Sequence, residues 1–392
     1  MRFKSNQPAG KSDTIIYILV FFLAIFGVVM VGSAGMEQAS VGIGPIFSLV
    51  RIQLIYLGIS WLTMWIISRI FTFRRFQRYF VLIAFFTLGL LISARFYPIV
   101  NGTYAWMRFN ILGRVVTFQP SELAKVVLIL LSAIYLGDLK ISKRSYGDYL
   151  KPLLLIGSLY LFVIVFIQRD LGTGIVLLGI GTITFLVPTH KPFLKFQLVI
   201  SLLVIGVVGF GFFLMSSPGI EFLKSIGIKS YQIARFQSAI NPFLDQSGDG
   251  YQVINSLIAI VKGGISGVGL GNSSQKYGYV PEVRTDSIFP IIAEELGIVG
   301  ISLVFLLYGA LIIRLFHYAG RVYDEKAKIV FIGVASYLFI HLVFNIGGIT
   351  GLIPLTGVPL LLISAGGSST LALLIGMGVV QALIRQYGLR KI

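Results

Sequence analysis

Long apolar runs separated by short polar segments make up most of this chain. Ten of these runs, each of roughly 20 residues, predict membrane-spanning helices. They cover residues 14–34, 52–70, 79–94, 121–136, 152–168, 172–188, 196–215, 288–315, 329–349 and 368–384. With no internal repeat in the chain, the pattern predicts an all-α polytopic membrane protein with one domain over residues 1–392.

The basic residues occur in alternate connecting segments. They lie before the first predicted helix, after the second, fourth, sixth and eighth, and at the end of the chain. Positive charge marks the cytoplasmic side, so both termini, including a tail over residues 1–13, are predicted to be cytoplasmic. The longer loops, 95–120, 216–287 and 350–367, then lie outside, and the active site is expected among them.

The composition agrees with a membrane protein and excludes several kinds of site. Of the 392 residues, 56% are hydrophobic and 12% are charged, whereas a soluble chain carries about a quarter charged residues. The net charge of +17 is spread over short loops. This distribution favours contact with anionic membrane lipids and argues against binding of nucleic acid. The chain has no cysteine and three scattered histidines, so no thiolate or histidine metal site is predicted.

The polar, glycine-rich segment 250–300 carries the most informative carboxylates. Asp286 follows PEVRT and comes at or just before a predicted helix start. It is either a helix N-cap or a partly desolvated carboxylate that accepts a proton. Glu294 and Glu295 follow two turns later on faces about 100° apart. They are either held in structural ion pairs or form part of a proton relay.

Two lysines are candidates for contact with an anionic substrate. In FQPSELAK, Pro120 suits a first helical turn, and Glu122 and Lys125 form an i, i+3 pair. The pair either fixes helix packing or lines a cavity in which Lys125 meets a phosphate. Lys276 follows the glycine-rich run 263–271, whose glycines favour a compact fold or close helix approach. Lys276 is either a solvated surface lysine or a contact for an anionic substrate.

The segment 351–369 reads GLIPLTGVPLLLISAGGSS, an apolar run broken by proline and glycine. Such a sequence predicts a re-entrant segment, which is tolerated where it is buried in protein or lines a cavity. Its hydroxyls, Ser364, Ser368 and Ser369, then face that cavity. No histidine is placed to activate a serine, which argues against a serine nucleophile.

Seven blocks in the same order resemble the SEDS family of shape, elongation, division and sporulation proteins. The blocks are FQPSELAK, QRDLGTG, NPFLDQSGDGYQ, GVGLGNSSQKYGYVPEVRTDSIF, EELGIVG, NIGG and PLTGVPLLLISAGGSS. The family includes FtsW, RodA and SpoVE, and the resemblance covers nearly the whole chain. The block from GDGYQ to YVPE favours the FtsW division branch over RodA.

The resemblance implies an inverting peptidoglycan glycosyltransferase of the bacterial cytoplasmic membrane that polymerises lipid II. Asp286 matches the family's aspartate and would deprotonate the acceptor hydroxyl, which attacks the undecaprenyl-linked glycan strand. The leaving pyrophosphate needs cations, from Lys125, Lys276 or a divalent cation such as Mg²⁺ or Mn²⁺.

The resemblance also implies further contacts and partners. The remaining candidate substrate-binding residues are Trp106, Gln119, Ser121, Glu122, Glu282, Ser364 and Ser368. The implied partners are a class B penicillin-binding protein, a transpeptidase that docks on late spans, and other division proteins. The alternatives are a RodA-like elongation polymerase, a lipid II flippase or transporter, and a scaffold of the division machinery.

Four positions depart from the family's pattern. Arg284 stands for the usual histidine, Ser287 for phenylalanine, Arg169 for proline, and Ala365 for the aromatic residue of the SYGGS motif. Arg284 is expected to favour the ionised form of its neighbour Asp286.

Overall fold

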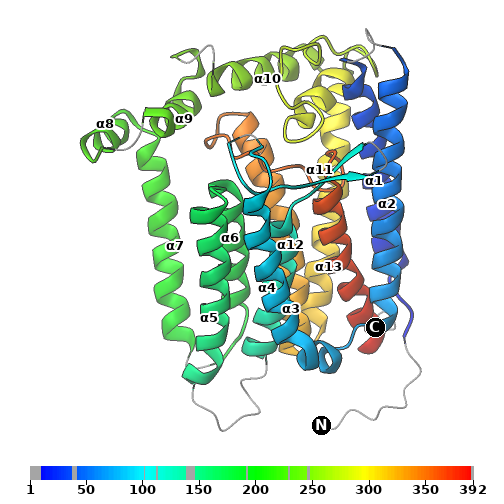
Figure 1. Ribbon diagram of the computed structural model, residues 1–392, viewed down its shortest axis with the longest axis vertical. Coiled ribbons are helices and arrows are strands. Elements are labelled where there is room, and N and C mark those ends of the chain that lie inside the picture. The colour runs from blue at the N-terminus through cyan, green and yellow to red at the C-terminus, as the bar shows by residue number, and fades with distance from the viewer. Residues whose placement is uncertain are drawn as a thin grey trace.

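The protein is described by a computed structural model in which a bundle of long helices stands upright (Figure 1). Each of the ten predicted apolar runs forms a helix in this bundle. The structure describes residues 10–37, 42–100, 102–111, 114–137, 146–190, 193–227, 230–244 and 248–389.

The bundle helices begin and end close to the predicted positions. They are α1 (Thr14–Ala34), α2 (Gly44–Ile70), α3 (Phe73–Ser93), α4 (Pro120–Gly137), α5 (Tyr146–Phe162, continued by a π-helical turn over Val163–Ile167), α6 (Leu171–Leu186), α7 (Leu194–Leu214), α11 (Ile288–Arg321), α12 (Glu325–Ile349) and α13 (Gly367–Gln386). Within the described residues, nine helices are long and apolar enough to cross a membrane, and α6 is shorter. The fold class is therefore confirmed, while the count of ten spans stays a prediction.

Helices α4, α12 and α13 form the centre of the bundle, and most of their side chains are buried. Helix α7 stands at the edge (Figure 1) and has one buried side chain, Gln197, along its described length. Its apolar residues point outward in all directions, as expected for a helix that faces lipid.

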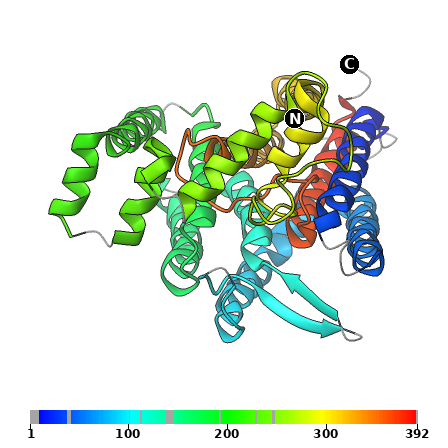
Figure 2. The same cartoon turned by 90° about the horizontal axis from the view of Figure 1, so that it is seen from above.

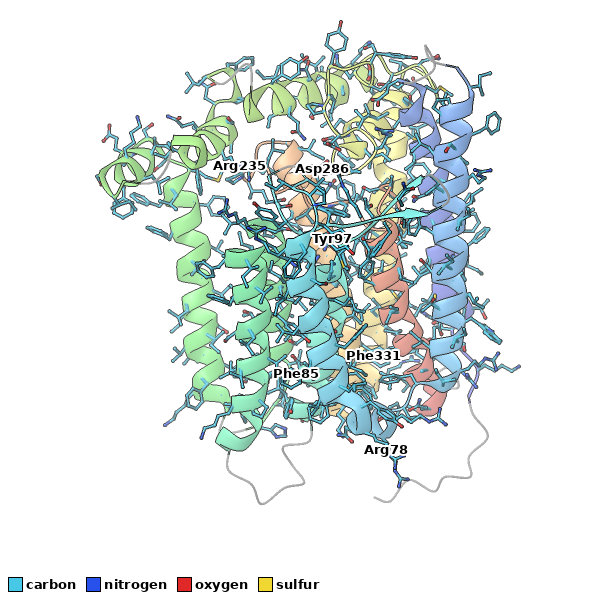
Figure 3. All side chains as sticks on the ribbon, in the orientation of Figure 1. Arg78, Phe85, Tyr97, Arg235, Asp286 and Phe331 are labelled. Atoms are coloured by element: carbon cyan, nitrogen blue, oxygen red, sulfur yellow. The ribbon has the colours of Figure 1, made fainter. Side chains whose placement is uncertain are left out.

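The two ends of the chain meet at one end of the bundle. The backbone N–H of Gly10 donates to the carbonyl of Arg385 at 2.9 Å. Asp13 caps α1, accepting a hydrogen bond from the N–H of Ile15, and its carboxylate pairs with Arg314 at 2.7 Å. The basic Arg78 lies at this end, whereas Asp286 lies near the opposite end (Figure 3).

The predicted outer loop 216–287 contains three helices that lie across the end of the bundle. These are α8 (Ser217–Ser225), α9 (Ser230–Ile240) and α10 (Asp249–Gly263), which Figure 1 shows above the upright helices. The residues of this segment that follow α10 form turns, and glycines allow close approach to α11. A Cβ at Gly263 would lie 1.9 Å from the carbonyl oxygen of Ala293, so α10 packs directly on the backbone of α11.

A β-hairpin forms where the sequence predicts a loop over residues 95–120. Strands β1 (Met107–Ile111) and β2 (Arg114–Phe118) pair antiparallel, with Met107 opposite Phe118. The hairpin projects sideways from the bundle (Figure 2). Apolar and polar residues alternate in β1, and β2 is rich in β-branched residues, which is typical of a strand pair.

The segment between α12 and α13 enters the bundle without forming a helix, as predicted for a re-entrant segment. Leu360 and Ile363 are fully buried, and a Cβ at Gly27 would meet the carbonyl of Leu362 at 2.4 Å. The Ser364 hydroxyl accepts a hydrogen bond from the N–H of Leu360 at 3.0 Å. Irregular backbone is thus surrounded by protein, where its polar groups find partners.

Candidate functional site

Asp286 lies in a tight turn that leads into α11. The N–H groups of Thr285 and Ser287 both donate to the carbonyl of Glu282, at 3.0 and 3.1 Å. Ser287 precedes the first residue of α11, and Gln252 of α10 donates to its hydroxyl at 2.7 Å. The N-cap interpretation of Asp286 is therefore wrong, because Ser287 occupies that position and Asp286 is free for another role.

The Asp286 carboxylate faces a small pocket between α10, α12 and the re-entrant segment. Asn345 of α12 donates to the backbone carbonyl of Asp286 at 2.7 Å and to that of Val358 at 2.8 Å. A Cβ at Gly357 would lie 3.6 Å from Oδ2 of Asp286. The pocket walls include these residues together with Gln252 and Thr356. Three distant parts of the chain thus hold one carboxylate in place.

Burial raises the pKa of Asp286 to about 6. The hydrogen bond that Thr285 Oγ1 donates to Oδ1 at 3.0 Å opposes this effect, and the negative charge of Glu282 adds to it. A carboxylate with a pKa near neutral pH is suited to general-base catalysis. The Arg284 guanidinium lies 3.6 Å from Glu37 and is not among the causes that shift this pKa. Arg284 is thus directed toward Glu37, and its effect on the ionised form of Asp286 stays a prediction.

Glu122 and Lys125 are buried and paired with each other at the centre of the bundle. Lys125 Nζ lies 2.8 Å from Glu122 Oε1 and 3.0 Å from His341 Nε2, and the Tyr337 hydroxyl donates to Glu122. Both members of the pair are 1% exposed. The structure agrees with the packing alternative, in which the pair joins α4 to α12.

Lys276 is fully buried, so the interpretation as a solvated surface lysine is wrong. Its Nζ lies 2.9 Å from Glu295 Oε1 and donates to the carbonyl of Gly271 at 2.6 Å. Ser33 of α1 donates to the same Glu295 carboxylate. The charge of Lys276 is therefore neutralised inside the protein.

Glu294 binds the other side of the same loop. It accepts hydrogen bonds from the N–H groups of Ser274 and Gln275, at 3.1 and 3.2 Å, and lies 3.1 Å from Lys262 Nζ. Both carboxylates of the Glu294–Glu295 pair thus hold the loop after α10 onto α11. This confirms the structural ion-pair alternative for the two residues.

The other candidate residues lie at two places. Gln119 connects the start of α4 with the start of α6, since its Nε2 donates to Asp170 Oδ2 at 3.2 Å. Ser121 is buried beside it, and Trp106 is half-buried just before β1. Ser364 and Ser368 are buried around the start of α13, and Ser364 holds the re-entrant turn.

Glu282 lies exposed in the turn that carries Asp286 and has a positive φ of 52°. Ala365, one of the departures, donates its N–H to the carbonyl of Arg284 at 2.8 Å, so two departures meet through the backbone. Glu282 and Ala365 thus lie near Asp286, whereas Glu122 and Lys125 belong to a separate buried cluster.

Asn345, Gln252 and Thr356 were given no role in the sequence analysis. Asn345 lies in the NIGG block and Thr356 in the PLTGVP block, so the signal was present. Within the described part of the chain, the buried Oδ1 of Asn345 and Oγ1 of Thr356 have no hydrogen-bond partner. Among the described residues no three His, Cys, Asp or Glu side chains gather as a metal site.

The chain is similar to known proteins over nearly its full length. Stage V sporulation protein E of Bacillus subtilis (strain 168) is 33% identical over 387 residues, which cover 97% of this chain and 98% of that protein. A probable peptidoglycan glycosyltransferase FtsW of the same organism is 34% identical over 377 residues, covering 93% of this chain and 89% of that protein.

Solved structures are similar as well. A chain from work described as "Structural coordination of polymerization and crosslinking by a peptidoglycan synthase complex" matches with a TM-score of 0.72 and 26% identity, covering 96% of this chain and 98% of that one. The rod shape determining protein RodA of Thermus thermophilus matches in fold, with a TM-score of 0.61 and 24% identity, covering 95% and 97%.

These similarities agree with the helix bundle and with the order of the sequence blocks. With nine helices able to cross a membrane in its described part, the chain is a multi-pass bacterial membrane protein. The family model for FtsW, RodA and SpoVE, described as a cell cycle protein, matches residues 13–387. The chain belongs to this family.

Proposed function

We propose that this protein is a peptidoglycan glycosyltransferase that polymerises lipid II into glycan strands during septal synthesis in cell division. The observation that carries the proposal is Asp286, a half-buried carboxylate with a pKa of about 6 in a pocket built by three parts of the chain. Relatives named FtsW support the division role over an elongation role.

Asp286 acts as the general base of an inverting displacement. It removes the proton from the C4 hydroxyl of the acceptor sugar while that oxygen forms a bond to the anomeric carbon of the donor strand. The bond from the anomeric carbon to the diphosphate oxygen breaks, and undecaprenyl diphosphate leaves with the electron pair. A single displacement turns an α-linked donor into a β-linked product, so one base is sufficient.

Asn345 positions this base through the backbone and does not touch the reacting atoms. Its hydrogen bonds to the carbonyls of Asp286 and Val358 hold the catalytic turn and the re-entrant segment on α12. Positioning of this kind matters because small displacements of a catalytic group lower rates strongly.

The active site lies on the outer face of the membrane, and both termini lie in the cytoplasm. Arg78 belongs to a basic connecting segment and lies at the end of the bundle opposite Asp286 (Figure 3). Because basic segments stay in the cytoplasm, this arrangement supports an outer position for Asp286, where lipid-linked sugars are presented.

A divalent cation, Mg²⁺ or Mn²⁺, is a further proposal that the pocket's donor atoms fit. Asn345 Oδ1 and Thr356 Oγ1, buried oxygens without a partner among the described residues, line the pocket beside Asp286 and would hold the cation. Water and the diphosphate of the substrate would complete its oxygen ligands, and the Asp286 carboxylate stays free as the base. The cation would supply positive charge for the diphosphate, and chelation followed by titration with Mg²⁺ or Mn²⁺ tests it.

A class B penicillin-binding protein is the proposed partner, together with other division proteins and membrane lipids. A structural relative belongs to a peptidoglycan synthase complex, which supports a partner transpeptidase for this chain. Copurification of the full chain with a class B transpeptidase from the same cell tests this pairing.

Polymerisation of labelled lipid II by the purified protein with its partner tests the enzymatic proposal. We expect Asp286→Asn to lower the rate about 10²–10⁴-fold, the usual contribution of a general base. Glu221→Gln, an exposed carboxylate on α8 at the same end of the molecule, is the control and should retain activity. An Asp286→Asn variant that polymerises at the wild-type rate contradicts the assignment.

The flippase alternative has less support from the structure. Glu294 and Glu295 are held in ion pairs and hydrogen bonds to the loop after α10, so neither is an open carboxylate of a proton relay. Translocation of lipid II in liposomes that persists in Asp286→Asn, without any glycan product, would favour that alternative.

A further inference from the structure

Two arginines at the outer end of the bundle share one aromatic ring. Arg95 follows α3, and Arg169 follows the π-helical turn after α5. Their Cζ atoms lie 3.8 and 5.8 Å from the centroid of the Tyr104 ring. A guanidinium within about 6 Å of an aromatic ring is attracted by the ring's quadrupole. One ring therefore holds two positive charges close together.

Among the described residues, no carboxylate neutralises these two charges. Both side chains are exposed, and across the described ranges no carboxylate lies within ion-pair distance of either guanidinium. Asp170, the next residue after Arg169, is turned toward α6, where it accepts hydrogen bonds from the N–H of Thr173 and from Gln119. Like charges held together without a counter-ion favour the binding of an anion.

The backbone holds this arrangement rigidly. The N–H of Tyr104 donates to the carbonyl of Gln168 at 2.8 Å, and the Gln168 side chain donates to the carbonyl of Leu91 at 2.7 Å. Arg169 has a positive φ of 61°, which a proline cannot adopt. Non-glycine residues in this conformation carry strain and gather at functional sites.

The helix start that follows Arg169 and the Asp286 carboxylate contact neighbouring residues of the segment between α12 and α13. A Cβ at Gly172, three residues after Arg169, would lie 2.4 Å from the carbonyl oxygen of Thr356. Gly357, the residue that follows Thr356, lies against the Asp286 carboxylate. Tyr97, two residues after Arg95, lies toward the same end of the bundle as Asp286 (Figure 3).

We propose that Arg95, Arg169 and Tyr104 form a binding site for the diphosphate group of a polyprenyl-diphosphate-linked sugar. The inference rests on the proposed function, which requires a cation for the leaving diphosphate. Lys125 and Lys276, the cations that the sequence predicted for this role, are buried and paired with glutamates. Two guanidinium groups that share one ring offer a fork for each of two linked phosphates, because each fork can bind phosphate oxygens with paired hydrogen bonds.

Binding of farnesyl diphosphate to the full protein in phosphatidylcholine nanodiscs tests the site without turnover. We expect Arg95→Gln and Arg169→Gln each to weaken binding roughly tenfold, as for the loss of a charged hydrogen bond. Tyr104→Leu should weaken it too, whereas Tyr104→Phe should retain it, because the ring holds the arginines. Arg108→Gln is the control, since Arg108 is exposed on β1 and is not placed over a ring in the described structure.

The same variants distinguish the diphosphate from other phosphate sources. Farnesyl monophosphate and phosphatidylglycerol should bind more weakly than the diphosphate and respond less to the arginine changes. If the arginine changes weaken the binding of phosphatidylglycerol as much as that of farnesyl diphosphate, the site is a lipid headgroup site and the assignment is overturned. Wild-type affinity for farnesyl diphosphate in both arginine variants would also overturn it.

Polymerisation assays separate this site from the proposed function. Arg169→Gln should raise the KM for lipid II without moving the acidic limb of the pH profile, which belongs to Asp286. If the wild-type protein binds farnesyl diphosphate through the arginines and makes no glycan, the proposed function fails and the site stands. If glycan forms at unchanged KM in both arginine variants, the site fails and the function stands.

Discussion

The pKa of Asp286 gives the sharpest test of the catalytic turn. Thr285 Oγ1 lies 3.0 Å from both Asp286 Oδ1 and Glu282 Oε2, so the two carboxylates share its one proton. The hydrogen bond to Asp286 holds down a pKa that burial raises to about 6. Thr285→Val removes the hydrogen bond and keeps the shape of the side chain. We therefore expect the pKa of Asp286 to rise, and the acidic limb of the rate profile to move to higher pH.

The size of the change follows from the energy of the hydrogen bond. A hydrogen bond to a charged acceptor contributes about 1.5–3 kcal/mol, and partial exposure of Asp286 places the effect at the low end, about one pH unit. At pH 6 about half of the wild-type carboxylate is ionised, against about a tenth in the variant, so the rate falls about fivefold. At pH 8 both forms are ionised, and the rates should agree.

Initial rates of lipid II polymerisation between about pH 5 and pH 8, at low lipid II, report the pKa of the free enzyme. Thr285→Ser keeps the hydroxyl and should follow the wild-type profile. Glu282→Gln removes a nearby negative charge and should move the limb to lower pH. A Thr285→Val profile that stays in place or moves to lower pH would refute the assignment of this limb to Asp286.

Three further predictions concern stability. A raised carboxylate pKa favours the protonated folded state, so Asp286 destabilises the fold as pH rises from about 4 to above 6. At pH 7.5, Asp286→Asn should therefore raise the free energy of unfolding by up to about 3 kcal/mol, which a thermal unfolding assay detects. The variant should lose this advantage below pH 4. Lys276→Met leaves Glu295 buried without its partner and should cost about 3–5 kcal/mol in a thermal unfolding assay, whereas adding Glu295→Met should recover part of the loss. Gly267→Ala should destabilise strongly, because its Cβ would meet the carbonyl of Glu295 at 2.1 Å. Gly278→Ala, at a similar positive φ with open space around it, should cost only about 1 kcal/mol; equal losses in the two glycine variants would contradict the packing argument.

The helices and the carboxylate at the head of α11 were predictable because they depend on local pattern. Helix α1 begins and ends at the predicted residues, since an apolar run in lipid must satisfy its own backbone. The hairpin of β1 and β2 was missed because a single strand pair inside a long loop gives a weak signal. The position of Asp286 just before a helix start was predicted. The interpretation of Asp286 as the N-cap was wrong, because Ser287, one residue later, occupies that position.

The roles of the charged residues depended on contacts between distant parts of the chain. Lys276 and Glu295 are 19 residues apart, and their shared partner Ser33 comes from α1. Arg95 and Arg169 come from separate loops and meet on Tyr104. Sequence spacing cannot show such pairs, since burial and ion pairing are set by packing between helices.

The sequence by itself determined the helix bundle, the membrane environment and the carboxylate that the family resemblance marks. Hydrophobic runs and basic segments act locally and are read directly along the chain. The tertiary structure decided which charges are available for chemistry. Folding buries Lys125 and Lys276 against glutamates and leaves the two arginines on Tyr104 exposed, because a buried charge is stable only when an opposite charge compensates it.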